Sequence, residues 1–177
     1  GVQTCALPIW FFINAAGTRL DDRTDARALY MVDQLPSKDR PKLMAMVSNF
    51  DHGSQKFHAE ALRKLVSTPA SREAAALQLV NACIKYGFAG VTLDFEEVPD
   101  DLQPAVITFS RILRAALAPG GRVLSSAIPV STDAELARQF ASVNDYLFLM
   151  LYDEHYGRGD PGPIASQKWF EAKLDTF

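Results

Sequence analysis

The chain has 177 residues, of which 48% are hydrophobic, and its formal net charge is −3 at pH 7. This is enough sequence for one sizeable hydrophobic core but not for two. The mild negative charge argues against nucleic acid or an anionic membrane surface as the main partner, and no apolar run approaches the roughly 20 residues that a membrane span needs.

The first nine residues, GVQTCALPI, look like the translation of a sequencing-library adapter. We therefore expect residues 1–9 to be an adapter-derived scar, and residues 10–177 to be the native sequence, beginning near Trp10. Cys5 falls within the scar, which leaves Cys83 in an apolar helical stripe. A small buried thiol is the better interpretation there than a reactive one.

Hydrophobic periodicity predicts strands and helices in alternation along the rest of the chain. We expect Pro36 to stop the first helix, and Asp100 or Asp101 to cap the helix that has Pro104 in its first turn. In chain order, the expected elements are a strand at 10–15, a helix at 23–35, a strand at 42–50, helices at about 57–66 and from 71 to the glycine stop at 87, a strand at 88–97, a helix from about 100 to the glycines at 120 and 121, a strand at 123–130, a helix at 133–140, a strand at 146–153 and a helix from 164 onward.

This alternation, with strands that are apolar almost throughout, is typical of a parallel sheet covered by helices. Both a doubly wound sheet and a barrel fit the pattern. Polar residues at 48–49, at 94 and 96, and at 152–153 lie at the carboxyl ends of their strands, which is where barrel active sites are built. A dinucleotide fold would need a glycine-rich turn after its first strand, and GTRL at 17–20 is not such a turn. The sequence therefore favours an α/β barrel.

The segment FAGVTLDFEE at 88–97 carries the clearest chemical signal. Alternation along a strand places Asp94 and Glu96 on one face, with Thr92, and sends Glu97 to the opposite face unless a bulge intervenes. Two carboxylates in one partly buried place cost free energy unless one keeps its proton at neutral pH, which is what a general acid requires. The alternative is a solvated strand end, or carboxylates paired with Arg or Lys.

Three motifs resemble glycoside hydrolase family 18, the chitinase-like (β/α)8 barrels, over nearly all of residues 10–177. GVTLDFEE is similar to the signature DGxDxDxE of this family, MLYD at 150–153 resembles its MxYD strand, and SNF at 48–50 is similar to its third-strand segment. The closest resemblance is to the family 18 domain of bacterial multidomain polysaccharide deacetylase and glycosyltransferase proteins. The order of the motifs implies an incomplete (β/α)8 TIM barrel with about strands two to six present. The residues that match the motifs are Gly90, Asp94, Glu96, Met150, Tyr152 and Asp153.

The resemblance implies a retaining, substrate-assisted glycosidase that cleaves β-linked N-acetylglucosamine polymers such as chitin, peptidoglycan or poly-N-acetylglucosamine. Glu96 would protonate the glycosidic oxygen and then activate water. Asp94 would hold the acetamido N–H and stabilise the oxazolinium ion, and Tyr152 would bind the acetamido carbonyl. The resemblance also implies no cofactor and no metal, and an extracytoplasmic or secreted location.

Four further residues are expected to bind substrate. Asn49 follows a strand end and can bind sugar hydroxyls, although Asn is also a common turn residue. Asp153 can support Asp94 or the attacking water, or cap the next segment. His155 can line the cleft or stabilise its loop. Met150 belongs to the MxYD motif and is interpreted as part of the barrel core as well.

Two positions depart from the family signature, because Ala89 replaces its first Asp and Thr92 its middle one. In the family, the middle carboxylate shares a proton with the next one. Thr92 can hydrogen-bond Asp94 but cannot accept its proton at neutral pH. A non-hydrolytic carbohydrate-binding barrel with an impaired proton relay is therefore the alternative, and retention of Glu96 favours the hydrolase. A metal-dependent deacetylase is disfavoured because the histidines lack the spacing of a metal site.

Overall fold

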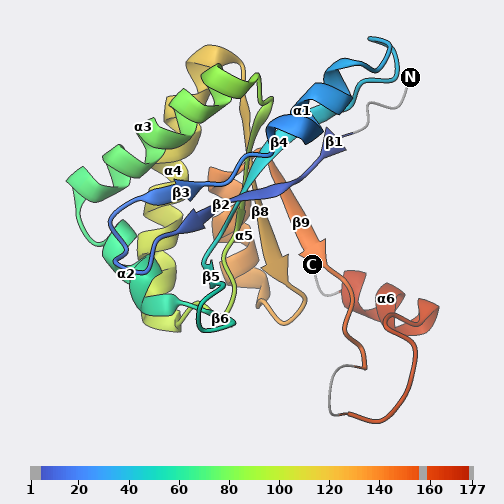
Figure 1. Cartoon of the computed structure of the whole chain (residues 1–177). Helices are drawn as coiled ribbons and strands as arrows, with labels where there is room; N and C mark the ends of the chain where they lie inside the picture. Colours follow the sequence, from blue (N-terminus) through green and yellow to red (C-terminus); the bar gives the residue numbers. More distant parts are fainter. Residues whose placement is uncertain (1–4, 156–158, 176–177) are drawn as a thin grey trace.

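The computed structural model describes residues 5–155 and 159–175, which form a mostly parallel sheet with helices on one face (Figure 1). The strands are β1 (Cys5–Ala6), β2 (Ile9–Ile13), β3 (Leu20–Asp22), β4 (Lys42–Ser48), β5 (Phe50–Asp51), β6 (Lys56–Phe57), β7 (Gly90–Asp94), β8 (Val123–Pro129) and β9 (Tyr146–Met150). The main sheet has the order β3-β2-β4-β7-β8-β9, and β1 pairs with β4. From β2 to β9 the neighbouring strands are parallel, and β3 lies antiparallel to β2 at one edge.

Four helices form a layer on one side of this sheet, while the first and last helices lie outside that layer (Figure 1). The layer consists of α2 (Ala59–Val66), α3 (Pro69–Tyr86), α4 (Gln103–Leu117) and α5 (Ala134–Val143); α1 (Ala26–Asp33) and α6 (Gln167–Leu174) are the outer helices, and two short 3-10 helices, η1 (Asp100–Leu102) and η2 (Ala118–Gly120), flank α4. In the part of the chain that the structure describes, none of the helices has the length and apolar character needed to cross a membrane.

A parallel sheet whose strands are connected by helices on one face is a segment of a (β/α)8 barrel, which confirms the predicted fold class. The five parallel strands β2, β4, β7, β8 and β9 are the five that the sequence predicts. Within the described residues the sheet stays open, with β3 and β9 at its two ends. The hairpin β5-β6 and strands β1 and β3 were not predicted, because segments of two or three residues are too short to show a periodic pattern.

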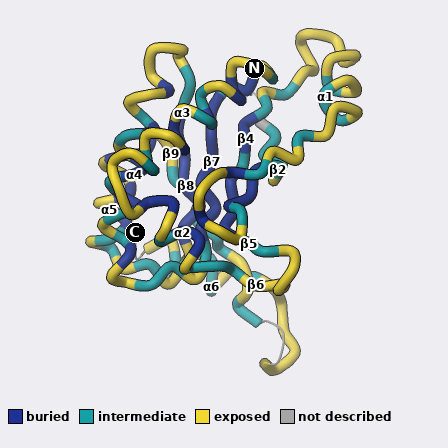
Figure 2. The backbone as a smooth tube through the Cα atoms, turned by 60° about the vertical axis from the view of Figure 1, so that its left-hand side comes forward, coloured by how far each residue is buried: buried dark blue, intermediate teal, exposed yellow. Residues whose placement is uncertain are grey.

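The main core lies between the sheet and the helix layer, and the buried stretches concentrate on β4, β7 and β8 (Figure 2). Side chains that alternate along the strands, such as Val47, Val91 and Leu124, are fully buried there. Cys83 of α3 belongs to this core, and burial raises the pKa of its thiol to about 11. The prediction of a buried, unreactive thiol at Cys83 is therefore confirmed. Outside this core, Cys5 and Ala6 form β1 and pair with β4. The adapter origin of residues 1–9 stays a prediction.

Helix boundaries differ from the predicted ones where a side chain outside the apolar pattern forms the cap. α3 begins at Pro69 rather than at residue 71, because Thr68 and Ser71 form a reciprocal capping box. The expected cap of α4 by Asp100 or Asp101 is wrong. The 3-10 helix η1 occupies that position, no side chain caps α4, and Asp101 instead pairs with Arg63 at 2.8 Å.

Gly90 opens β7 at a point where this strand comes very close to β8. A Cβ atom on Gly90 would lie 2.2 Å from the carbonyl oxygen of Val123, which is backbone and cannot move aside as a side chain can. We expect Gly90→Ala to lower the free energy of unfolding by about 1 to 3 kcal/mol, the usual cost of overpacking. Urea denaturation measures this loss. Gly53→Ala is the control, because its Cβ would meet only Asp51 at 3.5 Å; an equal loss in both variants would contradict the prediction.

Candidate active site

The carboxyl ends of β4 and β7 bring the first predicted site residues together. Ser48, the last residue of β4, pairs in register with Asp94, the last residue of β7. Both are buried, and Asn49, directly after Ser48, is also buried. Its side chain bonds the backbone of Glu96 twice, with the amide nitrogen donating to the carbonyl oxygen and the amide oxygen accepting from the N–H, each at 2.9 Å. The two motifs are thus joined by direct contacts.

Strand β7 ends at Asp94, so Glu96 lies in the following loop and not on the strand as predicted. The strict alternation that placed Glu96 beside Asp94 therefore does not extend to it. Both carboxyl groups nevertheless interact electrostatically. Burial raises the pKa of Asp94, and the pKa of Glu96 is raised first by burial and then by the negative charges of Asp94, Glu97 and Asp153. Glu96 is the carboxyl group on which these effects converge.

Tyr152 follows β9 and lies near the carboxyl groups of Glu96 and Asp94. This strand ends at Met150, and the chain then turns through Asp153, whose backbone is in the left-handed region at φ 66°. Burial raises the pKa of the Tyr152 hydroxyl, and the charges of Glu96, Asp94 and Asp153 raise it further. Tyr152 is 47% exposed, so its hydroxyl remains accessible to a ligand. The three residues predicted to be catalytic are therefore brought together.

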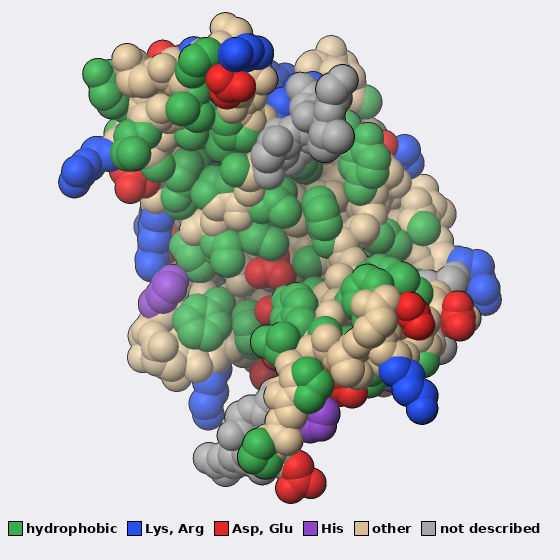
Figure 3. Space-filling model, turned by 90° about the vertical axis from the view of Figure 1, so that its right-hand side faces the viewer, with side chains coloured by type: hydrophobic (Ala, Val, Ile, Leu, Met, Phe, Trp, Pro, Cys, Tyr) green, Lys and Arg blue, Asp and Glu red, His purple; other side chains and the backbone are tan. Residues whose placement is uncertain are grey.

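The side of the sheet without a helix layer exposes a broad hydrophobic surface with acidic side chains in its middle (Figure 3). β9 contributes the exposed aromatic residues Tyr146 and Phe148, which share one face of the strand with Met150, and Tyr152 follows two residues after the strand. Leu147 and Leu149, on the other face of β9, pack against the core. In a (β/α)8 barrel this face of the sheet points into the interior and its apolar side chains pack as core, so the carboxyl groups at the strand ends are the candidate binding groups.

Thr92 occupies the position of the middle carboxylate, and its hydroxyl is 2.8 Å from the hydroxyl of Ser125 on β8. Both residues are fully buried and are paired in register. The hydrogen bond that the structure shows for Thr92 is thus with Ser125, whereas the sequence suggested Asp94. Ser125 was missed in the sequence, although two adjacent serines in an otherwise apolar strand were an available signal.

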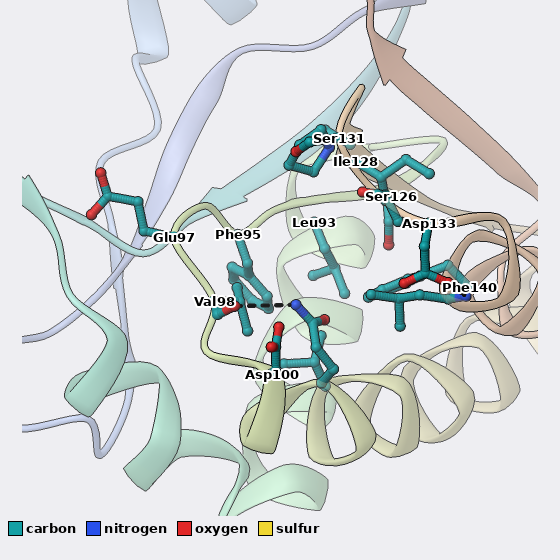
Figure 4. Close-up of a pocket in the computed structure, with 16 residues that line it drawn as sticks. Leu93, Phe95, Glu97, Val98, Asp100, Ser126, Ile128, Ser131, Asp133 and Phe140 are labelled. Atoms are coloured by element: carbon teal, nitrogen blue, oxygen red, sulfur yellow. Dashed lines mark hydrogen bonds between the residues drawn. The ribbon is translucent and has the colours of Figure 1, made fainter. Parts of the chain in front are cut away.

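Glu97 lies in the loop after β7 and lines a cavity on the helix side of the sheet, while its charge also acts on Glu96. That Glu96 and not Glu97 is the acid stays a prediction. The backbone of Glu97 has a φ of 51°, and the residue is exposed. Its neighbour Phe95 points with Leu93 into the same cavity, which has a volume of about 260 Å³ and lies between the ends of β7 and β8 and helices α4 and α5 (Figure 4). This cavity is on the helix side of the sheet, and its lining includes neither Asp94 nor Glu96. It is therefore distinct from the candidate site.

The four predicted binding residues occupy different places. Asp153 lies close enough to act on Glu96 and Tyr152 through its charge, and Met150 is half-buried at the end of β9. His155 lies against its own loop, with Nδ1 3.0 Å from the carbonyl oxygen of Pro163, which fits the loop-stabilising interpretation. Asn49 uses its amide for the Glu96 backbone. Substrate contacts by these residues stay predictions. No group of three metal-binding side chains occurs among the residues described.

Known proteins that resemble this chain include glycosylases and chitinases. No protein-family model matches the chain. The sporulation-specific glycosylase YdhD of Bacillus subtilis strain 168 is 30% identical over 129 residues, which is 69% of this chain and 30% of that protein. The chain thus spans less than a third of this relative.

Two solved structures share the fold of the chain. The structure of a chitinase from Chromobacterium violaceum matches with a TM-score of 0.81 and 24% identity, over 98% of this chain and 56% of that one. The spore cortex-lytic enzyme SleL of Bacillus cereus matches with a TM-score of 0.79 and 18% identity, over 96% of this chain and 40% of that one. The chain is therefore similar in sequence to a glycosylase and has the fold of the chitinase-like domains of glycoside hydrolase family 18.

Proposed function

We propose that this protein is a glycoside hydrolase that cleaves β-linked N-acetylglucosamine-containing polysaccharide by a retaining, substrate-assisted mechanism. Its substrate class includes chitin, peptidoglycan and poly-N-acetylglucosamine. The similarity to a sporulation-specific glycosylase and to a spore cortex-lytic enzyme supports a cell-wall type of polysaccharide. An extracytoplasmic or secreted location belongs to the same proposal, since such polymers lie outside the cytoplasm.

The observation that carries the proposal is the placement of Glu96, which is half-buried, held through its backbone by Asn49 and surrounded by the carboxyl groups of Asp94, Glu97 and Asp153. Burial and three neighbouring carboxyl groups all favour the protonated form of its side chain. A carboxyl group that keeps its proton closer to neutral pH can donate it to a leaving-group oxygen. Asp94 lies beside it with its own pKa raised by burial alone, and Tyr152 supplies a hydroxyl within the same electrostatic neighbourhood.

These groups suit the chemistry of a sugar that carries its own nucleophile. Glu96 gives its proton to the glycosidic oxygen while the acetamido carbonyl oxygen of the substrate attacks the anomeric carbon and the glycosidic bond breaks. Asp94 accepts a hydrogen bond from the acetamido N–H and stabilises the positive charge of the oxazolinium ring. Tyr152 donates a hydrogen bond to the acetamido oxygen. Glu96, now ionised, removes a proton from water as the water opens the ring, which restores the acid and retains the configuration.

A non-hydrolytic carbohydrate-binding barrel is the second candidate, and the contact between Thr92 and Ser125 favours it. With Thr92 bonded to Ser125 at 2.8 Å, no carboxylate stands behind Asp94 to take up its proton. Such a protein would keep the carboxyl cluster at the strand ends as a binding site. It would bind oligosaccharides without turnover.

Matched oligosaccharides test the proposal and separate the two candidates. We expect the protein to cleave N-acetylglucosamine oligomers and to leave glucose and deacetylated glucosamine oligomers intact, because only the first carries an acetamido nucleophile. Positioned intramolecular attack contributes effective molarities of roughly 10⁵ M or more. NMR of fresh product should show the β-anomer first. Equal cleavage of all three oligomers would contradict the mechanism, and binding without cleavage would establish the second candidate.

A further inference from the structure

Asn49 and Glu96 are 47 residues apart in sequence, yet the Asn49 amide forms both of its hydrogen bonds with the backbone of Glu96. Its nitrogen donates to the Glu96 carbonyl oxygen, and its oxygen accepts from the Glu96 N–H, each at 2.9 Å. Asn49 is only 1% exposed. Such burial leaves its side chain little access to a ligand, so a sugar contact is a poor account of this residue.

The Glu96 backbone needs these bonds because the sheet no longer supplies them. The pairing of β4 with β7 ends at Ser48 and Asp94, and Glu97 then turns into the left-handed region. A side-chain amide carries a donor and an acceptor side by side, as a peptide group does. The amide of Asn49 therefore extends the pairing between the two strands past the last pair of residues that the backbones join.

Asn49 is itself held firmly. Its backbone carbonyl oxygen accepts a hydrogen bond of 2.8 Å from the backbone N–H of His58. The His58 side chain in turn caps α2, because its Nδ1 accepts a hydrogen bond of 2.9 Å from the backbone N–H of Ala61. Contacts from β4 and from the start of α2 thus fix the residue that holds Glu96. A rigid support of this kind matters in catalysis, because a misplacement of about 1 Å can cost roughly 100-fold in rate.

We infer that Asn49 is a positioning residue that fixes the backbone of the general acid Glu96 and acts on turnover rather than on sugar binding. The inference rests on the proposed function and assigns Asn49 a role different from the substrate contact that the sequence suggested. The Asn49 side chain contacts the backbone of Glu96 and not its carboxyl group or the sugar. It acts through Glu96 alone.

Two substitutions with a matched control test the inference. Asn49→Ala removes both hydrogen bonds, and Asn49→Leu removes them while keeping most of the side-chain volume. Asn144→Ala is the control, because Asn144 is also buried, at 5% exposure, and also makes two side-chain hydrogen bonds, to Ser126 and Phe140. None of its partners belongs to the candidate site.

We expect both Asn49 variants to lower kcat on N-acetylglucosamine oligomers by roughly 10- to 100-fold with little change in KM. Asn144→Ala should lower the thermal unfolding midpoint by about as much as the Asn49 variants do, and it should leave kcat near that of the parent protein. A rise in KM without a fall in kcat would overturn the inference, because it is the signature of a sugar contact. Unchanged kcat, or failure of both Asn49 variants to fold, would overturn it as well, the latter because the amide would then support the whole fold.

Hydrogen exchange separates this inference from the proposed function. The N–H of Glu96 should exchange slowly in the parent protein and roughly tenfold or more faster in Asn49→Leu, whereas Asn144→Ala should leave it slow. This result would support positioning by Asn49 even in a protein that cleaves none of the oligomers, an outcome that would refute only the proposed function. Fast exchange of the Glu96 N–H in the parent protein would overturn the inference.

Discussion

Replacing Glu96 with Gln lowers kcat on N-acetylglucosamine oligomers by about 10²- to 10⁴-fold, the range that general acid–base catalysis contributes. The amide keeps the shape of the side chain but has no acidic proton to give and cannot accept one from water. Because the backbone contacts of Glu96 with Asn49 do not involve its side chain, the variant should fold normally. Oligomer affinity, measured by calorimetry, should stay close to that of the parent protein.

Glu97→Gln is the matched control for this prediction. Glu97 is the next residue in the chain and carries the same side chain, but it is exposed and lines the cavity on the helix side of the sheet, whose lining includes neither Asp94 nor Glu96 (Figure 4). Its substitution should leave most of the activity. The charge of Glu97 raises the pKa of Glu96, so its loss should move the alkaline limb of the pH profile slightly to lower pH. A larger loss in Glu97→Gln than in Glu96→Gln would show that the acid has been assigned to the wrong residue.

Replacing Asp94 with Asn should lower kcat by roughly 10²- to 10³-fold and also change the pH profile. The loss arises because a neutral amide cannot stabilise the positive oxazolinium ring as a carboxylate does. The pH effect has a definite sign. The charge of Asp94 raises the pKa of Glu96, so its removal lowers that pKa, and the acid loses its proton at a lower pH. The alkaline limb of kcat/KM should therefore move to lower pH.

Asp153→Asn is the comparison for Asp94. Asp153 also raises the pKa of Glu96, and Asn is well tolerated at its left-handed backbone conformation. This variant should move the alkaline limb in the same direction, with a smaller loss of kcat, because Asp153 is exposed and Asp94 is buried. Initial rates measured from about pH 4 to pH 9, a range that extends to roughly 4.7 units above the usual Glu pKa of about 4.3, test both variants. A limb that moves to higher pH in Asp94→Asn would contradict the assignment of Glu96 as the titrating acid.

The contact between Thr92 and Ser125 bears on how fast such an enzyme can turn over. In this site, Asp94 has burial alone as the cause of its raised pKa, and the hydroxyls of Thr92 and Ser125 share a hydrogen bond. The site therefore depends on Asp94 without a second carboxylate behind it. The predictions for Asp94 and Glu96 separate a slow hydrolase from a binding protein, because only a hydrolase has a kcat to lose.

Local pattern in the sequence was sufficient to predict the parallel strands, the helices between them and the polar ends of the strands. Strands such as β4 and β8 are buried on both faces over most of their length, so they are rich in apolar residues and easily recognised. The alternation of Asp94 with Leu93 and Phe95 follows from the pleat of a strand. The preference for Glu96 over Glu97 came from the same alternation, but β7 ends at Asp94, so the pleat does not decide between them.

Tertiary structure alone decided the contacts that hold the site together. Two sets of hydrogen bonds join segments that are distant in sequence: those of Asn49 to the Glu96 backbone, and the one between Thr92 and Ser125. The end of β7 at Asp94 was likewise not visible in the local pattern. Local periodicity contains no information about such partners, because hydrogen bonds across a sheet depend on register and on how each strand ends. The sequence therefore determined the fold and the carboxyl pair, whereas the packing of β4 against β7 determined how the candidate acid is held.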